Sequence, residues 1–209
     1  MLISLLFENP AVFFGWVLAL VISISFHEFS HAFAANALGD TTPKYEGRLT
    51  LNPLAHLDPL GTLLLVLIGF GWGKPVPFNP YNLRLHRFGP ALVSLAGPLA
   101  NLILVTIFVI ALKVLALFGL ANDAVTQLFF IIILLNTILM LFNLIPVAPL
   151  DGSKVLYTLL PRSLTWVAER MEQYGPYILL ALIILDNFAG IGIFDHIYNF
   201  GLSLLGRVL

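Results

Sequence analysis

The sequence predicts an all-α polytopic membrane protein with about 4–6 transmembrane helices and a short tucked or re-entrant segment. Composition is the first reason: of 209 residues, 59% are hydrophobic and only 10% are charged, against about 45–50% and about 25% in soluble domains. The mean hydropathy is +0.97. Long uncharged runs at 88–112 and 124–150 are the second reason, because a membrane helix needs about 20 mostly apolar residues.

The charge balance and the lack of cysteine narrow the function further. The formal net charge is −1, so nothing in the sequence indicates a nucleic-acid partner. No cysteine is present. Disulfides are therefore excluded, and any transition-metal site must use nitrogen and oxygen ligands.

The first predicted span covers residues 11–37, where only His27, Glu28 and His31 interrupt the apolar run. The next apolar segment, 61–73, has 13 residues, which is short for a span and favours a tucked or re-entrant segment. The proline-rich stretch that follows favours extended backbone, because proline is excluded from helix interiors.

Two further spans are predicted at 88–112 and 124–150, and neither contains a charged residue. The last apolar stretch, 176–194, is divided by Asp186. This stretch is either one long span with a buried acid or a span followed by an interfacial helix, and the sequence leaves both open.

Basic residues indicate which side of the membrane the loops occupy. A tucked 61–73 segment puts three loops on one side, namely 38–60, 74–87 and 151–173. These loops hold eight of the ten basic residues, whereas the connection on the other side holds only Lys113. By the positive-inside rule, the shared side is cytoplasmic.

The stretch HEFSH at 27–31 places three ionisable side chains inside the first span, where such groups are costly and indicate function. On a helix, His27 and His31 lie one turn apart on the same face and can bind one metal ion. Glu28 lies close enough to reach a water molecule at that metal. This is the H-E-x-x-H arrangement of two zinc ligands and a general base. The competing interpretation is a polar patch for hydrogen bonding between helices.

A catalytic zinc has three protein ligands and an open position for water, so a third ligand is expected. The candidates are His56, His86, His196, Asp58, Asp151 and Asp186. Asp151 stands out because two prolines break the preceding apolar helix beside it, and Gly152 permits a close approach. Asp151 can equally be the N-cap of the helix that follows. Together with HEFSH the ligand interpretation is favoured, since a tucked segment puts both motifs near the cytoplasmic side.

Five stretches follow one another along the chain: HEFSH at 27–31, LNPLAHLDP at 51–59, FGWGKPVPFNP at 70–80, AGPLAN at 96–101 and NLIPVAPLDG at 143–152. Together they resemble the site-2 protease family of intramembrane zinc metalloproteases, in its short prokaryotic form without a PDZ domain. The resemblance implies that His27, His31 and Asp151 bind one zinc ion per chain. It also implies that Glu28 is the catalytic base and that Asn143 supports the oxyanion.

The resemblance further implies a small membrane-embedded β region, in which residues 73–77 form a strand that holds a locally unwound transmembrane substrate. The chain is then one integral membrane protease domain over residues 1–209, with a catalytic core at 11–152 and a C-terminal membrane segment at 174–209. It would lie in the lipid bilayer of the cell membrane, with its active site toward the cytoplasm. His27 lies about ten residues, or about 15 Å, from the cytoplasmic end of its helix, so a polar channel for water is expected.

Two other functional classes are possible. A membrane transporter, or a proton or metal relay, would use His27, Glu28, His31 and Asp151. A relay needs polar residues along its whole path, however, and here they cluster at one depth. A non-catalytic scaffold with a relic site is the other class, and an intact ligand set beside Glu28 argues against it.

The remaining polar residues have structural interpretations. We expect His56 to order its loop through a hydrogen bond, because buried polar groups normally find partners. Asn101 and Asn136 are expected to form hydrogen bonds between helices. Asp186 is either a neutral acid within the membrane or a loop residue.

Overall fold

Helices make up 75% of the computed structural model, which describes residues 2–68 and 71–207. The α-helices are α1 (Leu2–Glu8), α2 (Pro10–Ala37), α3 (Thr42–Tyr45), α4 (Pro59–Ile68), α5 (Gly89–Leu117), α6 (Asp123–Asn143), α7 (Asp151–Leu159), α8 (Thr165–Ala189) and α9 (Ile193–Leu205). Three short 3-10 helices are η1 (Pro53–Ala55), η2 (Pro80–Asn82) and η3 (Arg162–Leu164). Residues 69 and 70, part of the predicted segment 61–73, lie outside the described residues.

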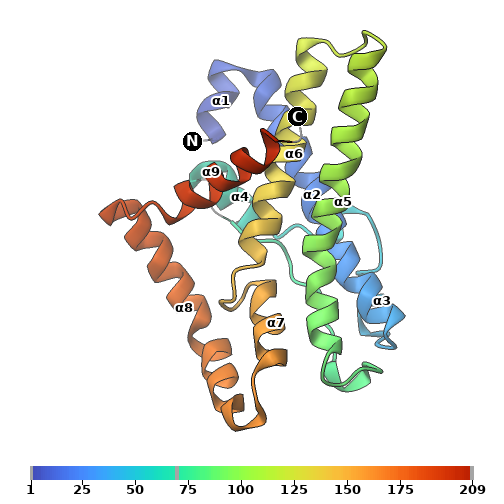
Figure 1. Cartoon of the computed structure of the whole chain (residues 1–209), viewed down its shortest axis with the longest axis vertical. Coiled ribbons are helices and arrows are strands. Elements are labelled where there is room, and N and C mark those ends of the chain that lie inside the picture. Colours follow the sequence, from blue (N-terminus) through green and yellow to red (C-terminus); the bar gives the residue numbers. More distant parts are fainter. Residues whose placement is uncertain (1, 69–70, 208–209) are drawn as a thin grey trace.

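Three helices, α2, α5 and α6, are long and apolar enough to cross a membrane. They pack against one another along the long axis of the molecule (Figure 1). The predicted spans at 11–37 and 88–112 lie within α2 and α5, whereas α6 ends at Asn143 rather than at residue 150. The helix ends early because two prolines follow, and proline cannot continue a helix. The all-α, membrane-integral fold predicted from the sequence is therefore confirmed.

The packed core lies where these three helices meet. Ala19 of α2 is fully buried and contacts Ile131 and Ile132 of α6. Val109 of α5 and Ile133 of α6 form a second cluster with residues of the C-terminal helix α9. Many apolar side chains of α5, among them Leu99, Ile103 and Ile107, are exposed, as expected of a helix that faces lipid.

The C-terminal part of the chain folds as two helices rather than one. α8 carries charged residues in its first half, so its apolar part is shorter than the about 20 residues that a span needs. α8 ends at Ala189, and α9 begins at Ile193 and packs on α6. The stretch 176–194 is thus not one continuous helix. Spans beyond the three, up to the predicted 4–6, stay a prediction.

Asp186 lies at the corner between these two helices. Its two carboxylate oxygens accept hydrogen bonds from the backbone N–H groups of Ile193 at 2.6 Å and Phe194 at 3.3 Å. The first N–H groups of a helix have no partner within the helix. Asp186 therefore caps α9 from the last turn of α8, so it is a helical residue and not the loop residue that the sequence left open as one alternative.

The predicted β region is reduced to one antiparallel bridge between Leu57 and Gly73, and the described residues contain no strand. Lys74 N–H donates to the carbonyl oxygen of His56 at 2.7 Å. Pro75 and Pro77 have no N–H, so they cannot extend this pairing into a ladder. The stretch is extended and proline-rich, as predicted, but the β region is not confirmed beyond the bridge.

The segment before it is a short helix. α4 has 10 residues and is therefore about 15 Å long, half the about 30 Å thickness of a bilayer's hydrocarbon core. α4 packs against α1 rather than within the bundle of long helices. Its length fits the tucked segment that the sequence predicts.

Candidate metal centre

Two histidines one turn apart on α2 turn toward the interior of the bundle. His27 and His31 are 7% and 8% exposed, and their Nε2 atoms lie 3.0 Å apart. Each ring is held at its other nitrogen. His31 Nδ1 lies 2.8 Å from the carbonyl oxygen of Val93, and His27 Nδ1 lies 2.7 Å from Asn101 Oδ1. The helix therefore presents two oriented imidazoles to the same point.

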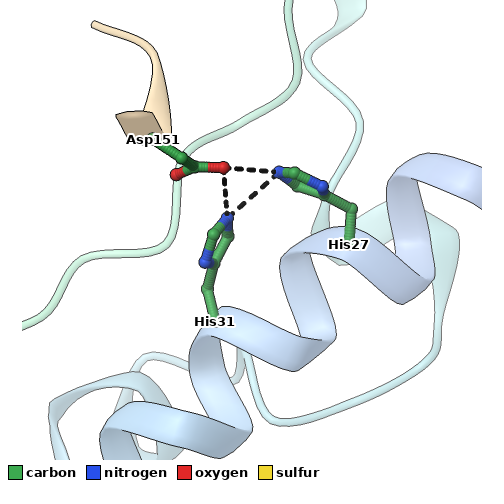
Figure 2. A group of neighbouring side chains, drawn as sticks. All are labelled: His27, His31 and Asp151. Atoms are coloured by element: carbon green, nitrogen blue, oxygen red, sulfur yellow. Dashed lines mark hydrogen bonds and ion pairs between the residues drawn. The ribbon is translucent and has the colours of Figure 1, made fainter. Parts of the chain in front are cut away.

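Asp151 reaches that point from the first turn of α7. Its Oδ2 lies 3.2 Å from His27 Nε2 and 3.4 Å from His31 Nε2 (Figure 2). The chain turns back after α6, and Gly152 is required there, because a Cβ at this position would collide with the carbonyl oxygen of Leu144. The N-cap of α7 is Leu150, and no side chain caps this helix. The capping alternative for Asp151 is therefore wrong, since the carboxylate faces the histidines instead.

The geometry of the three ligand atoms suits one metal ion. Donors bound tetrahedrally to zinc at about 2.0–2.2 Å lie about 3.3–3.6 Å apart, close to the separations of 3.0, 3.2 and 3.4 Å found here. Asp151 Oδ2 is buried and has no hydrogen-bond partner among the described residues. Burial opposes ionisation of Asp151, but its close polar contact with the two imidazoles outweighs burial and lowers its pKa to about 2. Two imidazoles and an ionised carboxylate thus meet around one position, which fits Zn²⁺.

All five predicted site residues line one cavity of about 230 Å³: His27, Glu28, His31, Asn143 and Asp151. Glu28 Oε2 is buried without a hydrogen-bond partner. Asn143 Nδ2 donates to the carbonyl oxygen of Leu139 at 3.0 Å, which uses one of its two amide protons. The cavity therefore contains an uncommitted carboxylate oxygen and an amide N–H beside the three ligand atoms.

A larger pocket of about 590 Å³ adjoins this cavity. Phe78 and Lys154 line both. The outer pocket is also lined by His86, Arg87 and Glu172, and Lys154 forms an ion pair with Glu172 of α8. Polar and charged groups therefore continue from the metal site toward the surface of the protein.

The other ligand candidates lie apart from this centre. Among the described residues, only His27, His31 and Asp151 form a group that could hold a metal ion. His56 is buried and its Nε2 bonds the Thr50 carbonyl oxygen at 2.7 Å, so the expectation that it orders its loop is confirmed. Asp58 accepts a hydrogen bond from Gly61 N–H at 2.8 Å.

Two residues of α5 complete the centre in ways that the sequence did not reveal. A Cβ at Gly97 would lie 2.5 Å from His27 Cε1 and 2.5 Å from His31 Nε2, so only glycine leaves room for the imidazoles. Asn101, one turn later, bonds His27. It also bonds Asn136, as expected of a contact between helices. The available signal was the spacing of glycine and asparagine in AGPLAN, at 96–101.

Comparison with known proteins gives consistent results. The model of peptidase family M50 matches residues 118–185. YwhC of Bacillus subtilis, named as a zinc metalloprotease, is 40% identical over 173 residues, which cover 80% of this chain and 79% of that protein. Rip2 of Mycolicibacterium smegmatis, also named as a zinc metalloprotease, is 34% identical over 174 residues, covering 81% of this chain and 65% of Rip2. No solved structure gives a significant match.

Proposed function

This chain belongs to peptidase family M50, the site-2 protease family, and from this premise we propose that it hydrolyses peptide bonds within or near transmembrane segments of membrane proteins. Members of the family are zinc metalloendopeptidases, and this chain is an integral membrane protein of that kind. One observation carries the proposal. A metal-binding triad and an uncommitted glutamate share one cavity among apolar helices.

We assign one zinc ion to His27, His31 and Asp151. Zinc held there supplies Lewis acidity to a water molecule and to a peptide carbonyl. Glu28 accepts a proton from that water at Oε2 as the water oxygen bonds to the carbonyl carbon. It then donates the proton to the amine nitrogen as the C–N bond breaks. Asn143 donates its remaining amide N–H to the oxyanion that develops.

The extended segment after Gly73 is the proposed place for the substrate backbone. Both backbone groups of Lys74 already have partners. Its N–H donates to the carbonyl oxygen of His56, and its carbonyl oxygen accepts from Arg48 Nη1 at 3.4 Å. Pro75 and Val76 line the metal-site cavity. A transmembrane helix that unwinds locally would pair with the backbone N–H and carbonyl of Val76, which lies between the two prolines, and its own amide would then face the site.

The active site is proposed to open toward the cytoplasm. The start of α5 and the turn between α7 and α8 lie at one end of the molecule, and the connection between α5 and α6 at the other (Figure 1). The first end carries most of the basic residues, which favours the cytoplasmic side. The outer pocket lined by Phe78 and Lys154 supplies the expected polar route for water.

We propose that residues 11–152 form the catalytic core and that residues 174–209 form a C-terminal membrane segment.

A transporter would need polar groups along a continuous path through the bundle. The buried Asn101 and Asn136 bond to each other at 2.8 Å, and the hydrogen bonds beyond them end inside the bundle, at the carbonyl oxygen of the buried Ala19. This arrangement favours a closed site over a path that crosses the membrane.

Comparison of wild type with Glu28→Gln in bacterial membranes tests the proposal. New protein termini are mapped by chemical labelling of membrane proteins, and zinc is measured on the purified protein. Glu28→Gln should keep about one zinc per chain and lose cleavage by about 10²–10⁴-fold, the usual contribution of a general base. The exposed Glu46→Gln is the matched control and should cleave like wild type. Termini that persist in Glu28→Gln, or that lie far from any transmembrane segment, would contradict the proposal.

A further inference from the structure

A line of buried hydrogen bonds runs from His27 through the centre of the three long helices. His27 Nδ1 lies 2.7 Å from Asn101 Oδ1, and Asn101 Nδ2 donates to Asn136 Oδ1 at 2.8 Å. Asn136 Nδ2 in turn donates to Ser23 Oγ at 2.7 Å. Ser23 donates to the carbonyl oxygen of Ala19 at 2.6 Å. Ser23, Asn101 and Asn136 are each 0% exposed, so bulk solvent does not compete for these hydrogen bonds.

The direction of this line is determined by a backbone carbonyl. Asn136 Nδ2 also lies 2.8 Å from the carbonyl oxygen of Ile132. A carbonyl oxygen can only accept, so the NH₂ end of the Asn136 amide must face it. The oxygen end of Asn136 then faces Asn101, and Asn101 must turn its own NH₂ end toward Asn136. The oxygen of Asn101 is thereby left facing His27.

The consequence is a defined tautomer of His27. Because Asn101 offers only an oxygen, Nδ1 of His27 must carry a proton and donate it. The lone pair of the neutral ring is then on Nε2, the atom that faces Asp151. His31 reaches the same state by a simpler route, since its Nδ1 faces the backbone carbonyl of Val93. His31 is thus oriented by a backbone carbonyl, whereas His27 is oriented by a series of hydrogen-bonded side chains.

We propose that Asn101 is a positioning residue for the metal ligand His27, with its orientation set by Asn136 and the Ile132 carbonyl. The proposal rests on the assignment of His27 as a zinc ligand. Outer partners of this kind orient the ligand ring and typically contribute about 10–100-fold to metal affinity. The network thereby connects the packing of α5 and α6 to the metal centre on α2.

Zinc affinity, measured by competition with a chelator on purified protein, is the first test. Asn101→Leu removes both hydrogen bonds and should weaken zinc binding by about 10–100-fold. Asn101→Asp restores an acceptor for His27 and should recover binding to within about threefold of wild type, although it loses the donor to Asn136. Asn136→Leu should cause a loss smaller than that of Asn101→Leu, because Asn101 can still reach His27 but nothing sets its orientation.

Thr137→Val is the matched control. Thr137 is also buried on α6, but it bonds only the Ile133 carbonyl oxygen, at 2.8 Å. It should bind zinc as wild type does. Equal affinity of Asn101→Leu and wild type, or a failure of Asn101→Asp to recover binding, would overturn the proposal, because a merely structural asparagine would not be rescued by an acid that breaks its contact between helices.

Nitrogen-15 NMR of histidine-labelled protein needs no variant of Ser23, Asn101 or Asn136 and remains decisive if Asn101→Leu does not fold. The chain has five histidines, and His27 is assigned by comparison with His27→Gln. We expect a proton on Nδ1 of His27 in both the zinc-loaded and the zinc-free protein. A His27 ring without a proton on Nδ1 in the zinc-free protein, or zinc bound through Nδ1, would overturn the inference. Absence of proteolysis with normal zinc binding would instead contradict only the proposed function.

Discussion

Asp151 and Asp186 both interrupt apolar stretches of the sequence, and the structure uses them in opposite ways. Asp186 lies at the α8–α9 corner, where two backbone N–H groups satisfy its oxygens. Asp151 lies at the start of α7, where its buried Oδ2 has no hydrogen-bond partner and faces two imidazoles. In the C-terminal hairpin, formed by α8 and α9, backbone N–H groups of the hairpin itself bond to Asp186. In the metal centre, Asp151 Oδ2 is left free to bind a metal ion.

The difference teaches how to interpret an acid in an apolar stretch. Such a residue must find a cation or donors, because a buried charge without a partner is too costly. Free N–H groups at the start of a helix are the simplest source, and α9 provides them to Asp186. The carboxylate of Asp151 instead turns from its own helix toward α2. A metal ion completes this arrangement, and the two acids should respond differently to removal.

The largest effect is expected from replacing each acid by alanine and measuring zinc on the purified proteins. Asp151→Ala removes one of three ligands and should lower zinc affinity by more than the about 100-fold upper range for loss of an outer partner. Asp186→Ala should bind zinc like wild type. It should lower the free energy of unfolding by about 1 kcal/mol, because it removes the cap of α9.

Two outcomes would break the comparison between these acids. Full zinc occupancy in Asp151→Ala would mean that the third ligand lies elsewhere. Loss of zinc in Asp186→Ala, with thermal stability unchanged, would mean that the C-terminal hairpin contributes to the metal centre.

Glycines in the same two regions sharpen the comparison. A Cβ at Gly97 of α5 would lie 2.5 Å from both histidine rings, whereas one at Gly201 of α9 would be in ordinary contact with Thr137 and Leu141 of α6, at 3.5 and 3.6 Å. Gly97→Ala should displace the imidazoles. Because a displacement of about 1 Å can cost about 10²-fold in rate, cleavage should fall by that order.

Gly201→Ala is the matched change in the C-terminal hairpin. It should leave both zinc binding and cleavage unchanged and stabilise α9 by up to about 1 kcal/mol, because alanine is the better helix former. Thermal unfolding, zinc analysis and cleavage assays on the two variants check these expectations. Normal cleavage in Gly97→Ala would show that the histidine rings have more room than the structure indicates.

Local rules account for the parts of the molecule that the sequence predicted well. The helical spacing of His27 and His31 places them on one face, and the prolines after α6 end that helix beside Asp151. The apolar runs predicted the three long helices for the same reason: length and composition are properties of a single segment.

The parts that sequence reasoning missed depend on packing between segments. Asn101 was expected to bond another helix, and it does, but its contact with His27 follows from how α5 lies against α2. The predicted β region assumed that extended backbone would pair. Proline residues limit it to the bridge at Gly73. Asp186 could be understood only once the start of α9 was located.

A third acid, Asp40, extends the comparison to the loop after α2, with the smallest expected effect. One carboxylate oxygen accepts from Thr42 N–H and hydroxyl and from Asn82 Nδ2, and the other accepts from Asn79 N–H at 2.6 Å. Burial opposes ionisation of Asp40, but these donors hold its pKa below the ordinary value of 3.8. Asp40 therefore resembles Asp186 in being satisfied by donors, and it fastens the loop at 79–82 to the end of α2.

Asp40→Asn keeps one acceptor and should lower the free energy of unfolding by roughly 1 kcal/mol at neutral pH, with zinc binding unchanged. A carboxyl whose pKa is lowered by folding stabilises the protein fully above its unfolded pKa, near 3.8. That contribution is lost as the pH falls through the lower folded value. Thermal unfolding in detergent should therefore show wild type and Asp40→Asn converging in acid, while the exposed Asp123→Asn tracks wild type throughout. A gap between wild type and Asp40→Asn that stays constant into acid would show that shape, and not charge, holds the loop.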